Sequence, residues 1–372
     1  MNIIIKKLSL VLLLALSFAA AAYSQKTGSL PTEIYVEGGK NHVQGIALDA
    51  EAGRMYFSFT TSFIKTDLQG KVLGSIDRIQ GHLGAMTFNK KNRKVYASLE
   101  CKDDAIGTGL SSFAKGRSMF YVAIIDVDKI DRVGMDSEDN EAFRIVCVKD
   151  ATRDYHLTGF ADKDYEHYYG CSGIDGVTIA PKLGKKGGKD YLYVAYGIYG
   201  DESRSDNDHQ VLLRYDFKTL DKYAAKVKFG DFYAKGPENP LDKYFVFTGN
   251  TNWGVQNLAY DKESGMMFLA VYKGKKPVYG NYDLFCFDAS EKPVSGTLAG
   301  VLYDRAKHPV VGSREKPVQG YGFKYGSTGL CPVGGGLFYI SENGRDKESG
   351  RQYCRARLYR WTGEEQGCFV RQ

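Results

Sequence analysis

Short runs in which apolar and polar residues alternate dominate this chain, and Gly, Asn or Asp bounds most of them. The clearest are residues 44–49, 53–59 and 63–70, which follow one another through polar turns. Alternation with a period of two is typical of a half-buried β-strand, whereas an amphipathic helix repeats its apolar residues about every 3.6 positions. No stretch sustains the helical period, so the pattern predicts an all-β protein.

The three-strand unit at 44–70 recurs four times downstream. Aligned first strands are 44–48, 84–88, 175–179, 256–260 and 328–331. Second strands are 55–58, 95–98, 192–195, 268–271 and 338–341, and third strands are 64–67, 123–126, 213–216, 285–288 and 358–361. Weaker fourth strands are expected at 72–76, 143–148, 244–248, 300–303 and 369–370.

Four antiparallel strands repeated five times predict a five-bladed β-propeller, in which each unit buries its two apolar faces against its neighbours. Residues 33–36 are expected to pair with the last blade and close the ring. The wide interval between Gly84 and Gly176 leaves six blades as the alternative, although no second set of three matching strands occurs there.

The first unit also carries a family resemblance. The run Gln44-Gly45-Ile46-Ala47-Leu48-Asp49, followed by Met55-Tyr56, resembles the opening of NHL-type and gluconolactonase-type propeller blades. The resemblance covers blade-core positions throughout the repeats and implies the propeller fold. The metal-binding Glu and Asn positions of those families cannot be mapped onto this sequence, so it implies little about activity.

The beginning of the chain predicts export. Lys6 and Lys7 precede an apolar run at 8–22, and small residues follow it at a suitable cleavage point. This is the pattern of a signal peptide over residues 1–24, which leaves 25–372 as a single propeller domain. No Cys lies near the cleavage point, and no later apolar run is long enough to span a membrane. We expect a secreted or periplasmic protein.

Charge and cysteine content narrow the expected partners. The formal net charge is +6, but basic and acidic residues are interspersed, and the dense basic run at 182–189 looks like a solvated turn. Nucleic-acid binding is therefore not expected, and we predict a monomer with a small-molecule or glycan ligand. The seven cysteines form no CxxC pair. Cys101–Cys171 and Cys354–Cys368 are candidate disulfides in an exported chain, whereas Cys147, Cys286 and Cys331 fall inside apolar strand runs and are expected in the core.

Strand order predicts where a site lies. In a propeller blade, the loop that leads into the innermost strand and the loop between the second and third strands lie on one face. Nearly all of the loop length and unusual composition in this chain falls in those two loop types. Because loops at one end of a rigid scaffold usually carry binding sites, we expect the site on the axis of this face.

The first residues of the inner strands should meet at that axis. They include His42, Gln44, His82, Asp175, Trp253 and Gln256. His42, His82 and Asp175 suit one divalent metal ion, calcium or a transition metal, or alternatively a general base. The remaining alternative is that these polar groups bond one another, the backbone and water in the central channel.

The loops after the second strands add further candidates. Glu100 and Glu342 are carboxylates that could form the acid–base pair of a glycosidase, or could be solvated and paired with arginines such as Arg345. Tyr196 and Tyr199, together with Trp253, are candidate platforms for a sugar ring. We expect Gln44, Gln256 and Arg345 to contact the substrate. No GxSxG occurs, so a serine nucleophile has no support.

Two functions remain open on these residues. The first is an exported hydrolase or lyase that acts on a carbohydrate or a small polar ester, with catalytic groups among His42, His82, Glu100, Asp175 and Glu342. The second is a non-catalytic propeller that binds a glycan or a protein through the same face. The fold alone does not separate them.

Overall fold

The computed structural model describes residues 30–110, 116–160, 165–226, 228 and 232–372. The chain divides into two units, residues 1–32 and 33–372, and the second contains every strand and helix of the described part. The predicted signal peptide at 1–24 lies outside the described residues. Among the described helices, none is long and apolar enough to cross a bilayer.

Five sheets form the blades of the unit Glu33–Gln372. From the inner strand outward, the first blade has β2 (Gly45–Asp49), β3 (Arg54–Ser58), β4 (Phe63–Asp67), β5 (Val72–Asp77) and β9 (Met135–Asp136), and the second has β6 (His82–Asn89), β7 (Lys94–Cys101), β8 (Met119–Asp126) and β10 (Phe143–Cys147). The third blade has β13 (Cys171–Pro181), β14 (Asp190–Ile198), β15 (His209–Tyr215), β16 (Asp242–Phe247), β21 (His308–Val311) and β20 (Val294–Gly296), and the fourth has β17 (Thr251–Tyr260), β18 (Met266–Lys273), β19 (Leu284–Asp288) and β22 (Gln319–Tyr321). The fifth blade has β23 (Leu330–Gly334), β24 (Leu337–Arg345) and β25 (Gln352–Trp361), and both β1 (Glu33–Glu37) and β26 (Phe369–Arg371) pair with β25.

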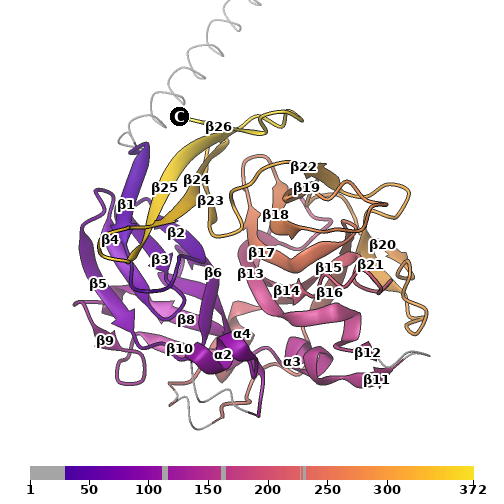
Figure 1. Ribbon diagram of the computed structural model, residues 1–372, viewed down its shortest axis with the longest axis horizontal. Coiled ribbons are helices and arrows are strands. Elements are labelled where there is room, and N and C mark those ends of the chain that lie inside the picture. The colour runs from indigo at the N-terminus through magenta and orange to yellow at the C-terminus, as the bar shows by residue number, and fades with distance from the viewer. Residues whose placement is uncertain (1–29, 111–115, 161–164, 227, 229–231) are drawn as a thin grey trace, which may run out of the picture. The chain divides into compact units, whose positions relative to one another are not determined.

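The inner strands of the five sheets form a closed ring. Strand β2 contacts β6, β6 contacts β13, β13 contacts β17, β17 contacts β23, and β23 returns to β2. Figure 1 shows the sheets following one another around this centre. The protein is therefore an all-β, five-bladed propeller, and the six-bladed alternative is wrong.

The ring closes between the amino-terminal strand and the last blade, as predicted. Strand β1 pairs antiparallel with β25 from Glu33 opposite Arg357 to Glu37 opposite Tyr353. Ile34 and Val36 point into the blade and are buried. The carboxyl-terminal β26 pairs with the other end of β25.

Repeated side-chain positions explain why the blades stack. The second strands carry a large aromatic residue at equivalent positions, and all five are fully buried: Tyr56, Tyr96, Tyr193, Phe268 and Tyr339. Alternate residues of each strand point to opposite faces of the sheet, so each blade presents an apolar face to both neighbours. The buried clusters accordingly mix residues of adjacent blades, such as Ile76 with Leu83 and Phe268 with Phe338.

One predicted fourth strand is wrong. Residues 300–303 are not a strand, and the fourth strand of that blade is β22. The chain before it forms the β20–β21 hairpin, which joins the edge of the neighbouring blade through parallel pairing of β21 with β16. The fourth strand of this blade therefore comes later in the sequence than its composition suggests.

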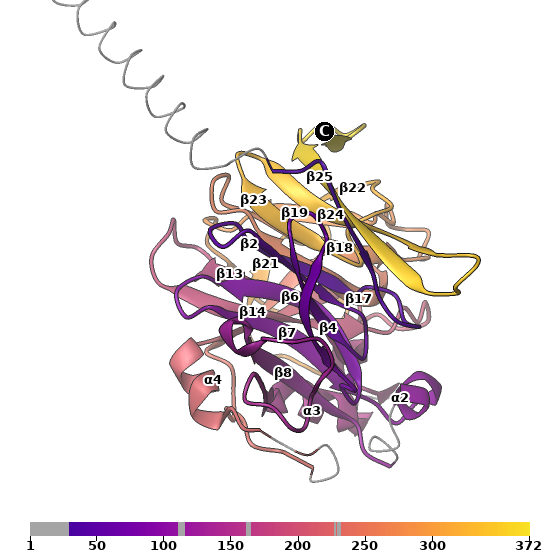
Figure 2. The same cartoon turned by 90° about the vertical axis from the view of Figure 1, so that its left-hand side faces the viewer.

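The long interval after the second blade's β8 contains small elements. They are η2 (Val127–Lys129), α3 (Lys149–His156), the hairpin of β11 (Thr158–Phe160) with β12 (Tyr165–Glu166), and η3 (Tyr168–Gly170); α2 (Ala105–Leu110) and α4 (Phe217–Tyr223) lie in other connections. Figure 2 shows α2 and α4 outside the sheets. No extra blade forms in the described part of this interval.

All seven cysteines are buried free thiols, so neither candidate disulfide forms. The thiols of the first pair face different partners: Cys101 Sγ donates to the Gln80 carbonyl, and Cys171 Sγ to the Ala151 carbonyl. Burial raises the pKa of Cys147 and of Cys286 to about 11, so these thiols stay protonated at neutral pH. The cysteines act as small apolar core residues.

Candidate functional site

A pocket of about 280 Å³ opens where the inner strands begin. Four of the five blades line it, and the predicted axial residues His42, Gln44, His82, Asp175, Trp253 and Gln256 are among its walls, together with Glu100. Bulges in β6, β13 and β17 lie beside this point, where the pairing register shifts near residues 83–86, 174–177 and 255–257. A bulge redirects side chains, which explains how strand residues reach the axis.

Glu100 and Lys102 connect two blades at the pocket wall. Ile174 N–H donates to Glu100 Oε1 at 2.9 Å, and Lys102 Nζ lies 3.1 Å from Glu100 Oε2. Lys102 Nζ also donates to the Ser172 carbonyl at 3.1 Å. Both oxygens of Glu100 are therefore engaged, and β7 of the second blade is tied to β13 of the third.

A glycine makes this contact between blades possible. Gly173 has a φ of +130°, and a Cβ at this position would lie 1.9 Å from Glu100 Oε1. Only a residue without a side chain lets the buried Glu100 carboxylate approach the backbone of β13 so closely. Glu100 is 4% exposed.

Burial and neighbouring charges set the protonation of this wall. Burial raises the pKa of the Glu100 carboxyl, while the Lys102 ion pair and the Ile174 N–H oppose the rise. Burial alone would lower the pKa of the Lys102 ammonium, but Glu100 and Asp175 raise it above its ordinary value. Lys102 therefore carries its positive charge inside the pocket.

Asp175 is the second carboxyl of this wall whose affinity for a proton is raised. Burial raises its pKa well above the ordinary value, the Glu100 carboxylate raises it further, and Lys102 and Gln256 only partly oppose the rise. Gln256 Nε2 donates to Asp175 Oδ2 at 2.9 Å and to the Trp253 carbonyl at 3.0 Å. The Gln256 amide therefore orients both the Asp175 carboxyl and the backbone of Trp253 at the mouth of the pocket.

The two histidines of the pocket are neutral. Burial, with help from Lys102 and His42, lowers the pKa of His82 to about 3, and burial also lowers the pKa of His42. His42 Nε2 lies 2.6 Å from Gln44 Nε2, and it accepts a hydrogen bond when the amide nitrogen donates. The buried Nδ1 of His82 has no hydrogen-bond partner.

His82, Glu100 and Asp175 each offer one ligand atom, and these three atoms lie within 4.8 Å of one another. A neutral imidazole and two carboxylates are a ligand set that divalent transition metals accept. The Lys102 ammonium already balances one of the two carboxylates, so it competes with such an ion. The geometric triad differs from the predicted one, because Glu100 replaces His42.

Four predicted residues lie outside this pocket. Tyr196 is fully buried, and its hydroxyl lies within hydrogen-bond distance of both Asp150 Oδ1, at 2.7 Å, and Asp154 Oδ2, at 2.8 Å, so it is no platform. Glu342 accepts a hydrogen bond from Tyr359, and Arg345 pairs with Gln352 at the end of β24. Tyr199 lies next to the pocket, where its ring centroid is 5.6 Å from that of Trp253.

Two of the lining residues that were not singled out from the sequence, Lys102 and Tyr272, add a charge and an aromatic ring to the pocket. Lys102 could have been found, because Glu100, Lys102 and Asp104 alternate as one face of an extended strand does. Tyr272 follows an apolar strand and gave no comparable signal. Tyr272 is 38% exposed and Trp253 is 40% exposed, so the mouth of the pocket has two accessible aromatic rings.

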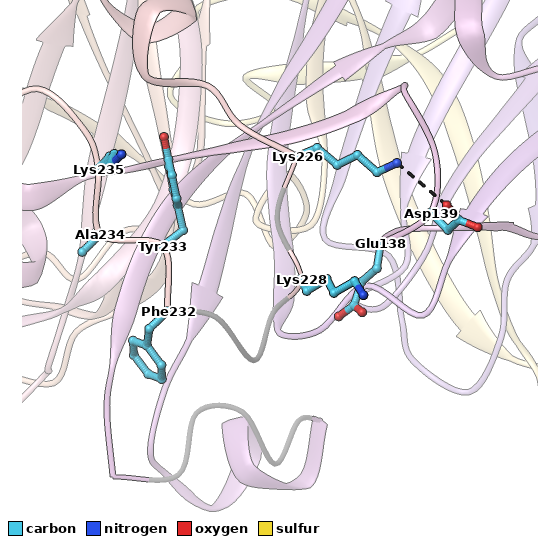
Figure 3. A pocket seen from close by; sticks show the side chains of 8 residues that line it. All are labelled: Glu138, Asp139, Lys226, Lys228, Phe232, Tyr233, Ala234 and Lys235. Atoms are coloured by element: carbon cyan, nitrogen blue, oxygen red, sulfur yellow. Dashed lines mark ion pairs between the residues drawn. The ribbon is translucent and has the colours of Figure 1, made fainter.

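A second hollow, of about 750 Å³, lies elsewhere on the molecule between residues 138–139 and the segment around 226–235. Figure 3 shows Lys226 directed toward Asp139, with which it forms an ion pair at 3.8 Å. The described charged residues that line it are exposed or only partly buried. It therefore lacks the buried polar groups that distinguish the axial pocket.

Comparisons with known proteins do not assign a family or a ligand to this site. No protein-family model matches the chain, and no curated protein matches it in sequence. The NHL or gluconolactonase type therefore stays a prediction. Among solved structures, the chain is similar to the computationally designed Ika4 protein, with 9% identity, coverage of 68% of this chain and 94% of that chain, and a TM-score of 0.27. A similarity of that size carries no argument.

Proposed function

We propose that this protein is an exported hydrolase or lyase that acts on a small polar substrate, a carbohydrate or an ester, in the axial pocket. One observation carries the proposal: Asp175, a carboxyl with a raised pKa, lies near the ring of neutral His82 in a pocket with an aromatic mouth. Perturbed titrating groups that meet in a pocket are typical of catalytic sites. The signal-like pattern at 1–24 supports export.

The two groups suit complementary roles on either side of the reacting bond. In hydrolysis, Asp175 gives its proton to the leaving oxygen as the C–O bond breaks, while neutral His82 orients the water that attacks the same carbon and whose proton passes to solvent. In elimination, a C=C bond forms as carbon loses its proton to solvent, and Asp175 again protonates the leaving oxygen. Lys102 stabilises negative charge that develops nearby, and Glu100 holds Lys102 in position.

As an alternative to that acid–base arrangement, we propose that His82, Glu100 and Asp175, once deprotonated, accept one divalent metal ion. The short separations among the three ligand atoms support this fit. A bound ion would polarise a substrate oxygen or lower the pKa of a water molecule. Elemental measurement on the dialysed protein should find about one ion per chain, and the His82→Ala variant should lose it.

The aromatic mouth supports one alternative, a non-catalytic propeller that binds a glycan or a protein. Trp253 and Tyr272 are the exposed rings that such a ligand would cover. The deciding experiment measures turnover of nitrophenyl glycosides, short esters, sugar lactones and uronate oligomers. The enzyme proposal requires turnover of at least one class and its loss in Asp175→Asn. Binding without turnover of any class would support the alternative.

A further inference from the structure

A larger hollow adjoins the axial pocket on the same loops. It measures about 920 Å³, and His167, Tyr199, Gly200, Asp201, Arg204 and Asn252 line it. Asn252 belongs to this outer hollow, whereas the next residue, Trp253, lines the axial pocket. The Tyr199 and Trp253 rings, whose centroids are 5.6 Å apart, therefore form the boundary between the two spaces.

The backbone fixes this aromatic boundary. Trp253 has a φ of +66°, a left-handed conformation that is costly for a bulky residue. The hydrogen bond from Gln256 to its carbonyl supports this conformation, and the Lys102 ammonium lies 5.9 Å from the indole centroid. The Tyr199 N–H donates to the Gly170 carbonyl, and the side-chain amide of Asn207 donates to the Tyr199 carbonyl. The two rings are thus preorganised, and Trp253 remains accessible.

The outer hollow combines an aromatic surface with exposed polar groups. The Tyr199 ring packs against His167 at a centroid distance of 5.2 Å. The Asn252 amide and the exposed Asp201 carboxylate flank it. The buried Arg204 donates to the Glu166 and His167 carbonyls and pairs with Asp206, so it fixes the floor of the hollow.

This combination matches a sugar chain better than a single small molecule. The axial pocket lies at or below the lower end of the ~300–1,000 Å³ typical of drug-sized ligands, which is room for one ring. Aromatic faces accept the C–H face of a sugar, while amides and carboxylates accept or donate hydrogen bonds at its hydroxyl edge. The outer hollow provides this chemistry beyond the first ring.

We infer that the ligand is an oligosaccharide, whose terminal ring enters the axial pocket and whose next rings cross Trp253 and Tyr199 into the outer hollow. The inference rests on the proposed function for the polar ligand of the axial pocket, but it does not require catalysis.

The test measures how affinity depends on chain length. Calorimetric titrations use glucose, xylose, galacturonic acid and N-acetylglucosamine, each as the monosaccharide and as linear di-, tri- and hexamers. At least one oligomer should bind about tenfold more tightly than its monosaccharide. Tyr199→Ala and Asn252→Ala should each bring that affinity ratio close to one, whereas Tyr199→Phe, which keeps the ring, should preserve it. Melting temperatures verify that the variants are folded.

The inference is overturned if no series binds, if monomer and oligomer bind equally, or if Tyr199→Ala weakens both by the same factor. Asp175→Asn separates this inference from the proposed reaction. Length-dependent binding that persists without any turnover, in the wild type as in Asp175→Asn, would remove the enzyme proposal and leave the oligosaccharide site standing. Turnover of a small ester without any dependence of binding on chain length would support the enzyme proposal and remove the oligosaccharide site.

Discussion

At the scale of single residues, Asp175 combines a cost in stability with a proposed role in chemistry. Its folded-state pKa lies above the ordinary value of about 3.9, so the unfolded chain releases the proton more readily than the folded chain does. The contribution of this carboxyl is therefore most favourable at low pH and is lost as the pH rises through the folded pKa. The wild-type protein carries this penalty at neutral pH.

Asp175→Asn should remove that penalty. The amide oxygen can still accept the hydrogen bond from Gln256, and the side chain cannot ionise. We expect the free energy of unfolding to rise by about 1 kcal/mol at pH 7 and the gain to vanish near pH 4, while turnover is lost. Urea unfolding at both pH values measures this. Asp201→Asn is the control, because Ser203 lowers the pKa of Asp201 and no gain is expected. A less stable Asp175→Asn at pH 7 would show that the carboxyl is ionised.

His82→Ala tests whether the pocket histidine is structural. The ring starts β6, is only partly buried, and leaves Nδ1 without a partner, so its removal should cost no more than about 1 kcal/mol. His209 provides a matched control, because it is 3% exposed and packs edge-on against Phe247. His209→Ala should cost about 3 kcal/mol. Global unfolding of His82→Ala in thermal melts would assign that residue to the core.

At the scale of elements, the contact between β7 and β13 positions the charged wall of the pocket. Gly173→Ala should displace Glu100 from Ile174 and leave the Glu100–Lys102 pair poorly satisfied inside the protein. We expect a loss of about 3 kcal/mol or more in the free energy of unfolding. Gly187→Ala, at a φ of +78° with open space around it, should cost only about 1 kcal/mol. Equal losses in denaturant melts would contradict this account.

Strand length explains which parts of the site the sequence could predict. The repeat identified the inner strands, so residues at their first positions, such as His82 and Asp175, were placed near one another in advance. The second strands were predicted to end at residues 98, 195 and 341, but β7, β14 and β24 continue to Cys101, Ile198 and Arg345. Residues assumed to lie in loops are therefore strand residues with fixed directions.

This difference in strand length explains why Tyr196 and Glu342 were wrongly placed at the site and why Lys102 was missed. Tyr196 alternates into the apolar interior of its blade, and Glu342 lies in the paired part of β24. Lys102 follows directly on β7, so it continues the direction of Glu100 into the pocket. Strand ends depend on pairing with a neighbour that is distant in sequence, and local alternation does not record that pairing.

At the scale of the whole molecule, the pocket depends on the closed ring. Its walls come from four blades, so no single blade holds the site. The fifth blade contributes no described lining residue, yet β23 contacts both β2 and β17 and keeps the first and fourth blades in place. Ring closure through β1 is therefore expected to support both stability and the site.

Removal of β1 should open the ring. A chain that begins at residue 38 loses the buried side chains of Ile34 and Val36 and the ion pairs of Glu33 with Arg355 and Arg357, and it exposes one edge of β25. At ~1.5–3 kcal/mol for each buried aliphatic side chain, we expect a loss of about 3–6 kcal/mol relative to a chain that begins at residue 30. Denaturant unfolding, followed by the fluorescence of Trp253 and Trp361, measures the difference. A synthetic peptide of residues 30–37 should restore stability in trans, whereas the same peptide with Ile34→Asn and Val36→Asn should not, because the apolar face of β1 is what the blade buries. Full stability of the shortened chain without any peptide would mean that β26 alone completes the last blade.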